Sequence, residues 1–365
     1  MRKKLHKILV VVSVIFSISY ICAYLSVHIS PQLFWFVAFL GFIFPYLAIV
    51  NCVFFIYWAI RRKRIFFFTF FIFLSGIPYL TDIFQYTYSN EKEEGSLKFL
   101  SYNVRVFNLY EWKHNLLMRD SIMNLINTEK PDILCIQEYF YDNSHNFKTT
   151  EILTDSFKLN YFHDAYTYKS ANIHNFGIAT FSRYPIVNEG EIRFPETNNI
   201  CIYTDIKINN DTVRVYNNHL QSVHFVKIEY ETIDSLGLKI DSTQITGLMG
   251  IFKKLKKSFA KRADQADIIS ESINQSPYPV FVCGDFNDTP VSYTYQKLSD
   301  NLRDAFCENG SGIGTTYIGR FPFLRIDFIL HSKQIEISDF RILKQNFSDH
   351  YPVSCNFKIM KKNDN

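Results

Sequence analysis

The chain has 365 residues, including 36 Phe and 23 Tyr, and a formal net charge of +4 at pH 7. Apolar residues crowd into roughly the first eighty positions and most acidic residues lie beyond them, so two physically different parts follow one another. From residue 97 onward, 30 Lys and Arg stand against 31 Asp and Glu. A second part so close to neutral does not support a surface that coats nucleic acid broadly through its cations.

Two long apolar stretches open the chain, at residues 8–29 and 33–60. Neither contains Asp, Glu, Lys or Arg, and each exceeds the roughly 20 residues with which a helix crosses a bilayer. A third run, 65–86, contains Pro78 and ends in aromatic residues typical of a membrane interface. We expect residues 1–88 to form a membrane region of about three transmembrane helices. No small-residue cleavage site follows the first stretch, which argues against a signal peptide.

The cations around these stretches predict the orientation. They precede the first stretch and separate the second from the third, at Arg2, Lys3, Lys4, Lys7, Arg61, Arg62, Lys63 and Arg64. Positive residues remain cytoplasmic, so three spans place everything after Asn90 outside. We therefore expect an integral protein of the cytoplasmic (inner) membrane whose second part is extracytoplasmic, or periplasmic. If the third run does not cross, that part faces the cytosol instead.

The polar segment 89–96 (SNEKEEGS) predicts a linker, and residues 97–359 are expected to form one domain. Strand-length apolar runs recur there, at 97–104, 133–137, 177–181, 200–208, 212–217, 280–283, 326–330 and 353–359. Helical patterns occupy 116–127 and 255–273, and Asn209, Asn210 and Asp211 signal a hairpin turn. This mixture indicates an α/β fold in which helices cover sheets.

Polar residues able to bind a metal or move a proton follow many of these apolar runs. They are Asn103, Glu138, His219, Asp285, Asn287, Asp327, Asp349 and His350. Each alone is more often a turn or solvated residue. Together they supply the carboxylates, amides and imidazoles with which a hard divalent cation is bound, a water is positioned and a leaving group is protonated.

Seven segments resemble, in sequence order, the signature segments of the endonuclease/exonuclease/phosphatase superfamily. They are SYNVR, DILCIQE, GIATFSRYPI, NNHLQS, VCGDFND, RIDFIL and SDHYPV, within residues 97–358. The resemblance implies a four-layered α/β sandwich, with two mixed β-sheets flanked by helices, and hydrolysis of phosphate esters. The substrate would be nucleic acid or a phospholipid head group, and no obligate protein partner is evident. The lipid bilayer would be contacted through the N-terminal helices.

The resemblance also implies which residues lie at the metal. Glu138 matches the principal carboxylate ligand of Mg²⁺, and Asn103 and Asp349 match residues near the ion. Mn²⁺ would be a possible substitute. These oxygen donors are the ligand types that Mg²⁺ prefers.

Further roles implied by the resemblance concern proton transfer. Asp285 and Asn287 match the pair that orients the attacking water, and His219 matches a histidine that protonates or stabilises the leaving oxygen. His350 would face the phosphoryl group while Asp327 fixes its ring. Whether the imidazole or the aspartate is the base stays open. Asn218 departs from the pattern, because many relatives have Thr there.

Two alternatives remain. The first is a phospholipid or sphingomyelin-type phosphodiesterase instead of a nuclease; a nuclease would need a basic groove beside the metal. The second is a membrane-tethered binding module without activity, which the complete set of site residues disfavours.

The segment 245–265 (ITGLMGIFKKLKKSFAKRADQ) combines six cations with apolar residues at helical spacing. It predicts either an outer helix packed on the sheet or a helix whose first half lies on the bilayer.

Overall fold

The computed structural model describes residues 2–86, 93–110, 115–143, 146–170, 173–223, 227–234, 242–319 and 321–360. The chain divides into two compact units, each described by itself below. The first comprises Met1–Thr81, Gln221–Ala266 and Asn287–Lys297, and the second comprises Asp82–Leu220, Asp267–Phe286 and Leu298–Asn365. This division differs from the expected one, because two segments of the expected 97–359 domain belong to the unit of the apolar helices.

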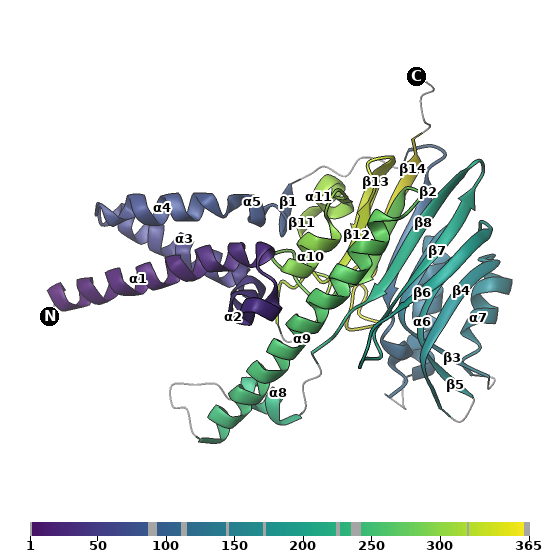
Figure 1. The fold of residues 1–365 in the computed structure, drawn as a ribbon, viewed down its shortest axis with the longest axis horizontal. Helices are drawn as coiled ribbons and strands as arrows, with labels where there is room; N and C mark the ends of the chain where they lie inside the picture. The colour runs from purple at the N-terminus through teal and green to yellow at the C-terminus, as the bar shows by residue number, and fades with distance from the viewer. Residues whose placement is uncertain are drawn as a thin grey trace. The chain divides into compact units, whose positions relative to one another are not determined.

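The second unit is built on two six-stranded mixed sheets, drawn in Figure 1. The first sheet has the order β13-β14-β2-β3-β5-β4, and the second has the order β10-β12-β9-β8-β7-β6. One pair in each sheet is parallel, β2 with β3 and β8 with β9, and the remaining pairs are antiparallel.

The strands of the first sheet are β2 (Leu97–Asn103), β3 (Ile133–Asp142), β4 (Tyr161–Ser170), β5 (His174–Ser182), β13 (Ile335–Ile342) and β14 (Val353–Ile359). Those of the second are β6 (Ile186–Arg193), β7 (Ile200–Ile208), β8 (Asp211–His219), β9 (Val280–Asp285), β10 (Arg303–Asp304) and β12 (Asp327–His331). A small third sheet pairs β1 (Phe84–Tyr86) with β11 (Ser311–Ile313). The short helices of this unit are α7 (Thr149–Glu151) and α11 (Ala305–Asn309).

Apolar side chains fill the space between the two large sheets. The ring of Phe281 on β9 lies 4.6 Å from that of Phe99 on β2 and 5.0 Å from that of Phe357 on β14, measured between centroids. Helix α6 (Asn115–Glu129) packs Ile122 and Ile126 on the opposite face of the first sheet. The predicted α/β architecture, two mixed sheets flanked by helices, is therefore confirmed.

Every expected strand falls on an observed one, and the hairpin turn lies between β7 and β8 as predicted. Besides the short strands β1, β10 and β11, three longer strands were not expected, β4, β6 and β13. All three lie at the edges of their sheets, where one side of the strand has no neighbour and fewer side chains are buried. Their sequences are correspondingly polar, as in IVNEGEIR of β6, and a search for apolar runs misses them.

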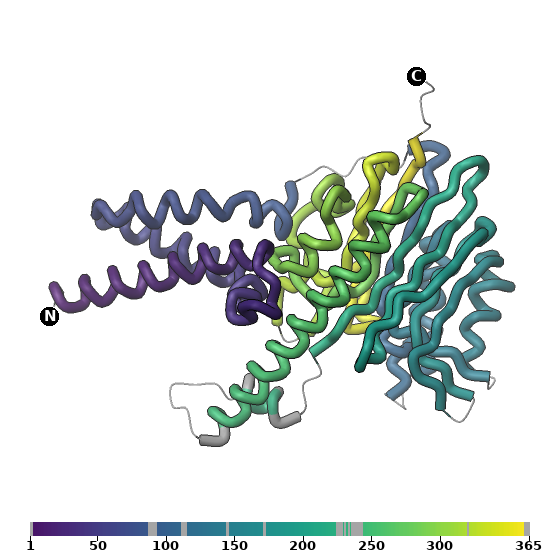
Figure 2. Tube along the Cα trace, viewed as in Figure 1, coloured from purple at the N-terminus to yellow at the C-terminus, as the bar shows by residue number. Residues whose placement is uncertain are grey.

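The first unit contains the apolar helices, shown as purple and blue tubes in Figure 2. They are α1 (Arg2–Leu25), α2 (Pro31–Phe42), α3 (Phe44–Ile60), α4 (Ile65–Ser75) and α5 (Ile77–Leu80), with the 3-10 turn η1 (Ser26–His28). Helices α8 (Lys227–Asp234), most of α9 (Ser242–Asn274) and all but the last residue of α10 (Tyr293–Leu298) also belong to it. Helices α1, α3 and α4 pack side by side.

Only α1 is by itself long and apolar enough to cross a membrane among the described residues. The expected second span is broken, because α2 and α3 meet at an angle of 58°. The expected third span, 65–86, is not one helix: α4 has 11 residues, and Phe84–Tyr86 form strand β1. Eleven residues rise only about 17 Å. The predicted linker 89–96 lies partly outside the described residues, which resume at Glu93.

The segment 245–265 is helical, as predicted, within α9, and its apolar face packs against α2, a partner that neither expectation included. Its apolar residues Ile251, Leu255 and Phe259 form a cluster with Ala38 of α2. The ring of Phe252 lies 5.3 Å from that of Phe39 on α2, measured between centroids. The apolar face of this half of α9 is therefore covered by α2.

Candidate active site

Four strands of the second unit end or begin at a residue of the predicted set. Asn103 ends β2, His219 ends β8, Asp285 ends β9 and Asp327 begins β12. Because β2 runs parallel to β3 and β8 runs parallel to β9, the carboxyl ends of each pair meet at one edge of their sheet. This edge is where α/β sheets commonly bind ligands.

Glu138 lies inside β3 at an irregularity in its pairing with β5. The register shifts between Ile136 and Tyr139, so that two residues of β3 stand opposite one of β5. Glu138 adopts φ of +49°, a left-handed conformation that a non-glycine residue rarely takes. A bulge of this kind redirects a side chain out of the regular alternation of the strand. It turns Glu138 towards the polar residues at the strand ends.

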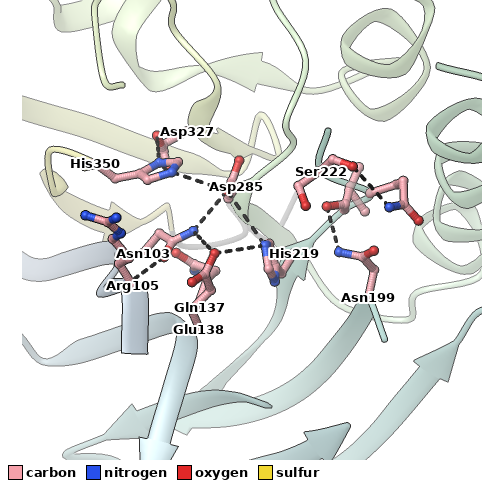
Figure 3. Close-up of polar contacts among 12 residues, drawn as sticks. Asn103, Arg105, Gln137, Glu138, Asn199, His219, Ser222, Asp285, Asp327 and His350 are labelled. Atoms are coloured by element: carbon pink, nitrogen blue, oxygen red, sulfur yellow. Dashed lines mark hydrogen bonds and ion pairs between the residues drawn. The ribbon is translucent and has the colours of Figure 1, made fainter. Parts of the chain in front are cut away.

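Figure 3 shows the polar contacts that connect these side chains. The amide nitrogen of Asn103 donates to Asp285 Oδ2 at 3.0 Å and lies 3.4 Å from Glu138 Oε1. His219 Nε2 lies 3.6 Å from Glu138 Oε1 and 3.9 Å from Asp285 Oδ2. The ends of both sheets thus contribute to one polar group of residues.

His350 and Asp327 form the second part of the site. His350 Nδ1 lies 2.9 Å from Asp327 Oδ2 and 3.1 Å from Oδ1, and both side chains are buried. The other ring nitrogen, Nε2, lies 3.7 Å from Asp285 Oδ2. Tyr317 packs its ring edge-on to the imidazole, with centroids 5.2 Å apart. The ring of His350 is therefore held from both sides and directed at Asp285.

Asp349 is less buried and has a basic neighbour that the sequence analysis did not single out. Arg105 Nε lies 3.5 Å from Asp349 Oδ2, and about half of the Arg105 side chain is exposed. Arg105 begins the turn η2 (Arg105–Asn108), in which all four residues have φ between +46° and +53°. Its position in SYNVR was the available signal, because a cation two residues after Asn103 can meet a phosphate.

Gln137, another residue that the sequence analysis passed over, ties the two sheets together beside Glu138. Its amide nitrogen donates to Asn217 Oδ1 on β8 at 2.7 Å and to Ser101 Oγ on β2 at 3.1 Å. The remaining predicted residue, Asn287, follows Asp285 by two positions, in the loop after β9, with φ of +53°. It lies on the segment that belongs to the first unit.

The environment changes the protonation of two site residues. Burial raises the pKa of Glu138, nearby His350 lowers it, and Asp349 raises it further, so that the net shift is upward. Burial alone would lower the pKa of His350, but the carboxylates of Asp327, Asp285 and Asp349 outweigh it and raise the pKa to about 10. His350 is therefore cationic at neutral pH in this arrangement.

The residues around Glu138 fit a hard divalent cation. Glu138 and Asp349 offer carboxylate oxygens, and the raised pKa of Glu138 marks a partly buried carboxylate that a nearby cation would stabilise. Asn103 turns its amide nitrogen, not its oxygen, towards Glu138 and Asp285, so in this geometry it orients the carboxylates. Its implied position near the ion is compatible with that role.

A second group of possible ligands lies close by. One ligand atom from each of Asp285, Asp327 and His350 falls within 4.8 Å of the others. Both oxygens of Asp327 already face His350 Nδ1, so a cation bound there would have to displace that interaction. We therefore interpret this group as a hydrogen-bonded pair, Asp327 and His350, beside Asp285.

Comparisons with known proteins agree with this geometry. The model of the "Endonuclease/Exonuclease/phosphatase family" matches residues 100–350, and a model described as "Domain of unknown function (DUF8431)" matches residues 6–83. No curated protein sequence matches the chain.

Solved structures resemble the chain in fold at low sequence identity. A mannosyl-6-phosphatase of Bacteroides thetaiotaomicron has 16% identity and a TM-score of 0.51, with 72% of this chain and 100% of that chain covered. A humanized TDP2 of D. rerio has 15% identity and a TM-score of 0.50, with 72% and 99% covered. The human Nocturnin catalytic domain has 20% identity and a TM-score of 0.49, with 73% and 95% covered.

Proposed function

This chain belongs to the endonuclease/exonuclease/phosphatase family, whose members are metal-dependent phosphoester hydrolases, and we propose that it is a membrane-anchored, Mg²⁺-dependent phosphoesterase that hydrolyses phosphodiester or phosphomonoester bonds. The observation that most directly supports this proposal is the contact between Asn103 Nδ2 and Asp285 Oδ2 at 3.0 Å, with Glu138 and His219 beside it. This contact joins the first sheet to the second at their strand ends. Hydrolysis of a phosphate ester depends mainly on such positioning and on neutralisation of charge.

The side chains divide the proton transfers of hydrolysis between them. Asp285 accepts a hydrogen bond from the attacking water and takes its proton as the oxygen–phosphorus bond forms. His219 gives a proton to the leaving oxygen as the ester bond breaks. His350, cationic because Asp327 and Asp285 raise its pKa, donates a hydrogen bond to a phosphoryl oxygen. Arg105 offers a second cationic contact for the phosphate.

A divalent cation would be held by Glu138 and Asp349, with Asn103 ordering the carboxylates. When bound, it would withdraw charge from a phosphoryl oxygen and steady the leaving oxygen. The oxygen-only donor set favours Mg²⁺, with Mn²⁺ as a substitute, over softer metals that prefer nitrogen and sulfur.

Membrane anchoring is supported by the inverted polarity of the α1, α3 and α4 bundle. Its interior holds hydrogen-bonded polar residues: Ser17 Oγ donates to Asn51 Oδ1 at 3.0 Å, and Trp58 Nε1 donates to Ser13 Oγ at 3.2 Å. Its outside exposes apolar side chains, which are Ile8, Val11, Ile15, Ile18, Ile49, Val53, Ile56, Ile60, Phe67, Phe71 and Leu74. Exposing such an apolar surface to water is unfavourable in free energy, whereas contact with the apolar chains of lipids is not.

The proposed orientation follows from the two ends of this bundle. The N-terminal end of α1 and the turn between α3 and α4 lie together at one end, and they carry the two cation clusters (Figure 1). The turn η1 and helix α5 lie at the other. Cations at one end only favour a cytoplasmic location for that end. The chain leaves the other end at Thr81 for the catalytic unit, which would then be extracytoplasmic, or periplasmic.

A phospholipid head group is the second candidate substrate, instead of nucleic acid, and a surface of the first unit favours it. Exposed apolar and cationic residues gather on α2 and on the first half of α9: Leu33, Phe34, Phe36, Ile245, Met249, Lys253, Lys256 and Lys257. We name these residues the α2–α9 surface. Apolar groups for the interface beside cations for anionic head groups suit contact with a bilayer.

The test is hydrolysis by the full chain in detergent and in vesicles. The panel comprises a nitrophenyl phosphodiester, single- and double-stranded DNA, sphingomyelin and inositol phosphates, each with Mg²⁺ and with excess chelator. We expect turnover of the nitrophenyl diester with Mg²⁺ and none with chelator. Full activity in chelator would remove the metal-dependent mechanism. For the lipid substrate, a variant with Lys253, Lys256 and Lys257 changed to Gln should lose activity on anionic vesicles but not on the nitrophenyl diester.

A further inference from the structure

The chain crosses between its two units directly after two residues of the proposed site. It leaves the second unit after Leu220, which follows His219, and again after Phe286, which follows Asp285. The loops that continue from these strands, Gln221 onward and Asn287 onward, both belong to the unit of the apolar helices. Contacts that fix these two loops therefore also restrain His219 and Asp285, which are only a few backbone bonds away.

A single buried arginine of α9 joins the two loops. Arg262 is 1% exposed, and its Nε lies 3.1 Å from Asp288 Oδ2 while its guanidinium also donates to the carbonyl oxygen of Gln221 at 2.8 Å. Asp288 in turn accepts from Thr294 Oγ1 at 3.0 Å and from the backbone N–H of Thr289 at 3.0 Å. One planar guanidinium thus fixes two loops that lie 67 positions apart in the chain, Gln221 and Asp288.

Neighbouring residues on the same face of α9 strengthen this connection. The backbone N–H of Gln221 donates to Gln265 Oε1 at 2.9 Å, and Ser258 Oγ donates to the carbonyl oxygen of Ser222 at 3.2 Å. Ser258, Arg262 and Gln265 are spaced by four and three residues, so they lie on one side of the helix. All three residues on that side of α9 make hydrogen bonds with the loop after His219.

Helix α9 is itself anchored on α2. Besides the apolar cluster of Ile251, Leu255 and Phe259 with Ala38, Gln32 of α2 donates to Asp264. A second connection reaches the other loop, because the buried Ser26 Oγ of η1 donates to the carbonyl oxygen of Val291 at 3.1 Å. The loop after Asp285 is therefore bound directly to η1, and the loop after His219 is bound to α2 through α9.

Stability alone does not account for the buried pair of Arg262 and Asp288. Burying two charges costs desolvation that their attraction barely offsets, and apolar replacements of such pairs are often neutral. What the pair provides is geometry, since the guanidinium directs separate hydrogen bonds to the side chain of Asp288 in one loop and to the backbone of Gln221 in the other.

We propose that Arg262 is a positioning residue for the active site, which fixes the loops after His219 and Asp285, and that α2 and η1 anchor this arrangement. The apolar helices are then part of the support of the active site and not only a tether. This inference rests on the proposed function of His219 and Asp285.

The first test is Arg262→Lys in the full chain. An ammonium group can still pair with Asp288 but cannot reproduce both directed bonds of the guanidinium. We expect kcat for the nitrophenyl diester, per folded molecule, to fall about tenfold with little change in KM, because misplaced groups lose rate before affinity. Amide hydrogen exchange should become faster in 220–223 and 286–291.

A second variant probes the anchor without touching α9. A Cβ at Gly41 would lie 2.2 Å from Ser26 Oγ and 2.5 Å from the carbonyl oxygen of Val291. Gly41→Ala should therefore also lower kcat for the soluble diester and speed exchange in 286–291, although Gly41 lies in an apolar helix. If the apolar helices served only as a tether, Gly41→Ala would leave both kcat and hydrogen exchange in 286–291 unchanged.

The matched control is Arg214→Lys, which alters a partly buried arginine paired with a buried aspartate, Asp205, at 2.6 Å. It should lower stability but leave kcat per folded molecule and exchange in both loops unchanged. The proposal would be overturned if Arg262→Lys kept the kcat of the wild type. It would also be overturned if activity fell only in proportion to the amount of folded protein while hydrogen exchange in both loops stayed unchanged. If the wild type hydrolyses no substrate, the proposed function fails, and hydrogen exchange still decides the role of Arg262.

Discussion

His350 Nδ1 lies 2.9 Å from Asp327 Oδ2. Both residues are buried, and they are 23 positions apart in the sequence. The carboxylate fixes which ring nitrogen points at Asp285 and also raises the pKa of the imidazole. Asp327→Asn keeps the shape but removes the charge. We expect a fall in kcat of about 10- to 100-fold, as for other carboxylates that orient a functional histidine.

His350→Ala removes the phosphate contact itself and should cost orders of magnitude in turnover, with the fold retained. Steady-state kinetics of both variants, with circular dichroism to check folding, measure the two effects. If Asp327→Asn were more harmful than His350→Ala, Asp327 would have a role of its own beyond the ring.

The environment of Glu138 leads to a prediction about metal dependence. Glu138→Gln preserves the volume and the contact with Asn103 but removes the charge that would hold the cation. We expect activity to require a much higher Mg²⁺ concentration and maximal turnover to fall by orders of magnitude. The measurement is a Mg²⁺ titration of turnover, with calorimetric binding of Mn²⁺ as an independent readout. Unchanged Mn²⁺ binding in the variant would place the ion elsewhere, for example at Asp285.

The raised pKa of His350 predicts a pH dependence of stability in the metal-free protein. The folded pKa of about 10 lies above the ordinary value of 6.5, so the folded state favours the protonated ring. Its contribution is complete below the ordinary value and is lost as pH rises through about 10. The gap in melting temperature between wild type and His350→Gln should therefore narrow from neutral pH upward.

Nuclear magnetic resonance of labelled histidine rings checks this directly. The signal that disappears in His350→Gln should still be that of a cationic ring at about pH 8. A signal that titrates near the ordinary histidine pKa would show that the aspartates do not hold the proton.

Sequence patterns predicted the central strands of this fold and missed its edges for a physical reason. Strands such as β3 and β9 are buried on both faces and read as apolar runs, whereas no position of β6 is fully buried and exposed positions alternate with half-buried ones along most of it. The extent of the apolar helices was also overestimated. Hydropathy reports which residues are apolar but not which element they form, and Phe84–Tyr86 form a strand that pairs with β11 while Phe84 and Tyr86 stay exposed.

The candidate site was predictable from the resemblance, residue by residue, but not its supports. Arg105 was marked only by its place in SYNVR, and its turn depends on four left-handed residues, of which only Asn108 is of a type that favours this conformation. The link between Arg262 and Asp288 joins an outer helix to a loop, so neither residue reveals its partner in the sequence. Such contacts arise from tertiary packing alone.

Membrane topology is predicted by the two cation clusters. A reporter enzyme active only outside the cytoplasm should be active when fused after Asn365 and inactive when fused after Arg64. A control fusion of a reporter that works only in the cytoplasm should give the reverse pattern. If both fusions behaved as cytoplasmic, the segment after Arg64 would not cross, and the catalytic unit would face the cytosol.

Gly284 lies immediately before Asp285 and leads to the last prediction. Its φ is +113°, and a Cβ there would lie 2.2 Å from the carbonyl oxygen of Asn218 on the neighbouring strand. Gly284→Ala must therefore strain the backbone and push β8 from β9, the two strands that carry His219 and Asp285.

Gly312→Ala is the control, because Gly312 also has positive φ, +71°, with no atom within 4 Å of the added Cβ. Its backbone strain should cost about 1–2 kcal/mol. We expect Gly284→Ala to cost more stability than that and to lower kcat, while the folded control keeps the kcat of the wild type. Thermal unfolding and kinetics of the full chain compare them, and equal stability with equal kcat would mean that β8 and β9 tolerate the methyl group without moving the site.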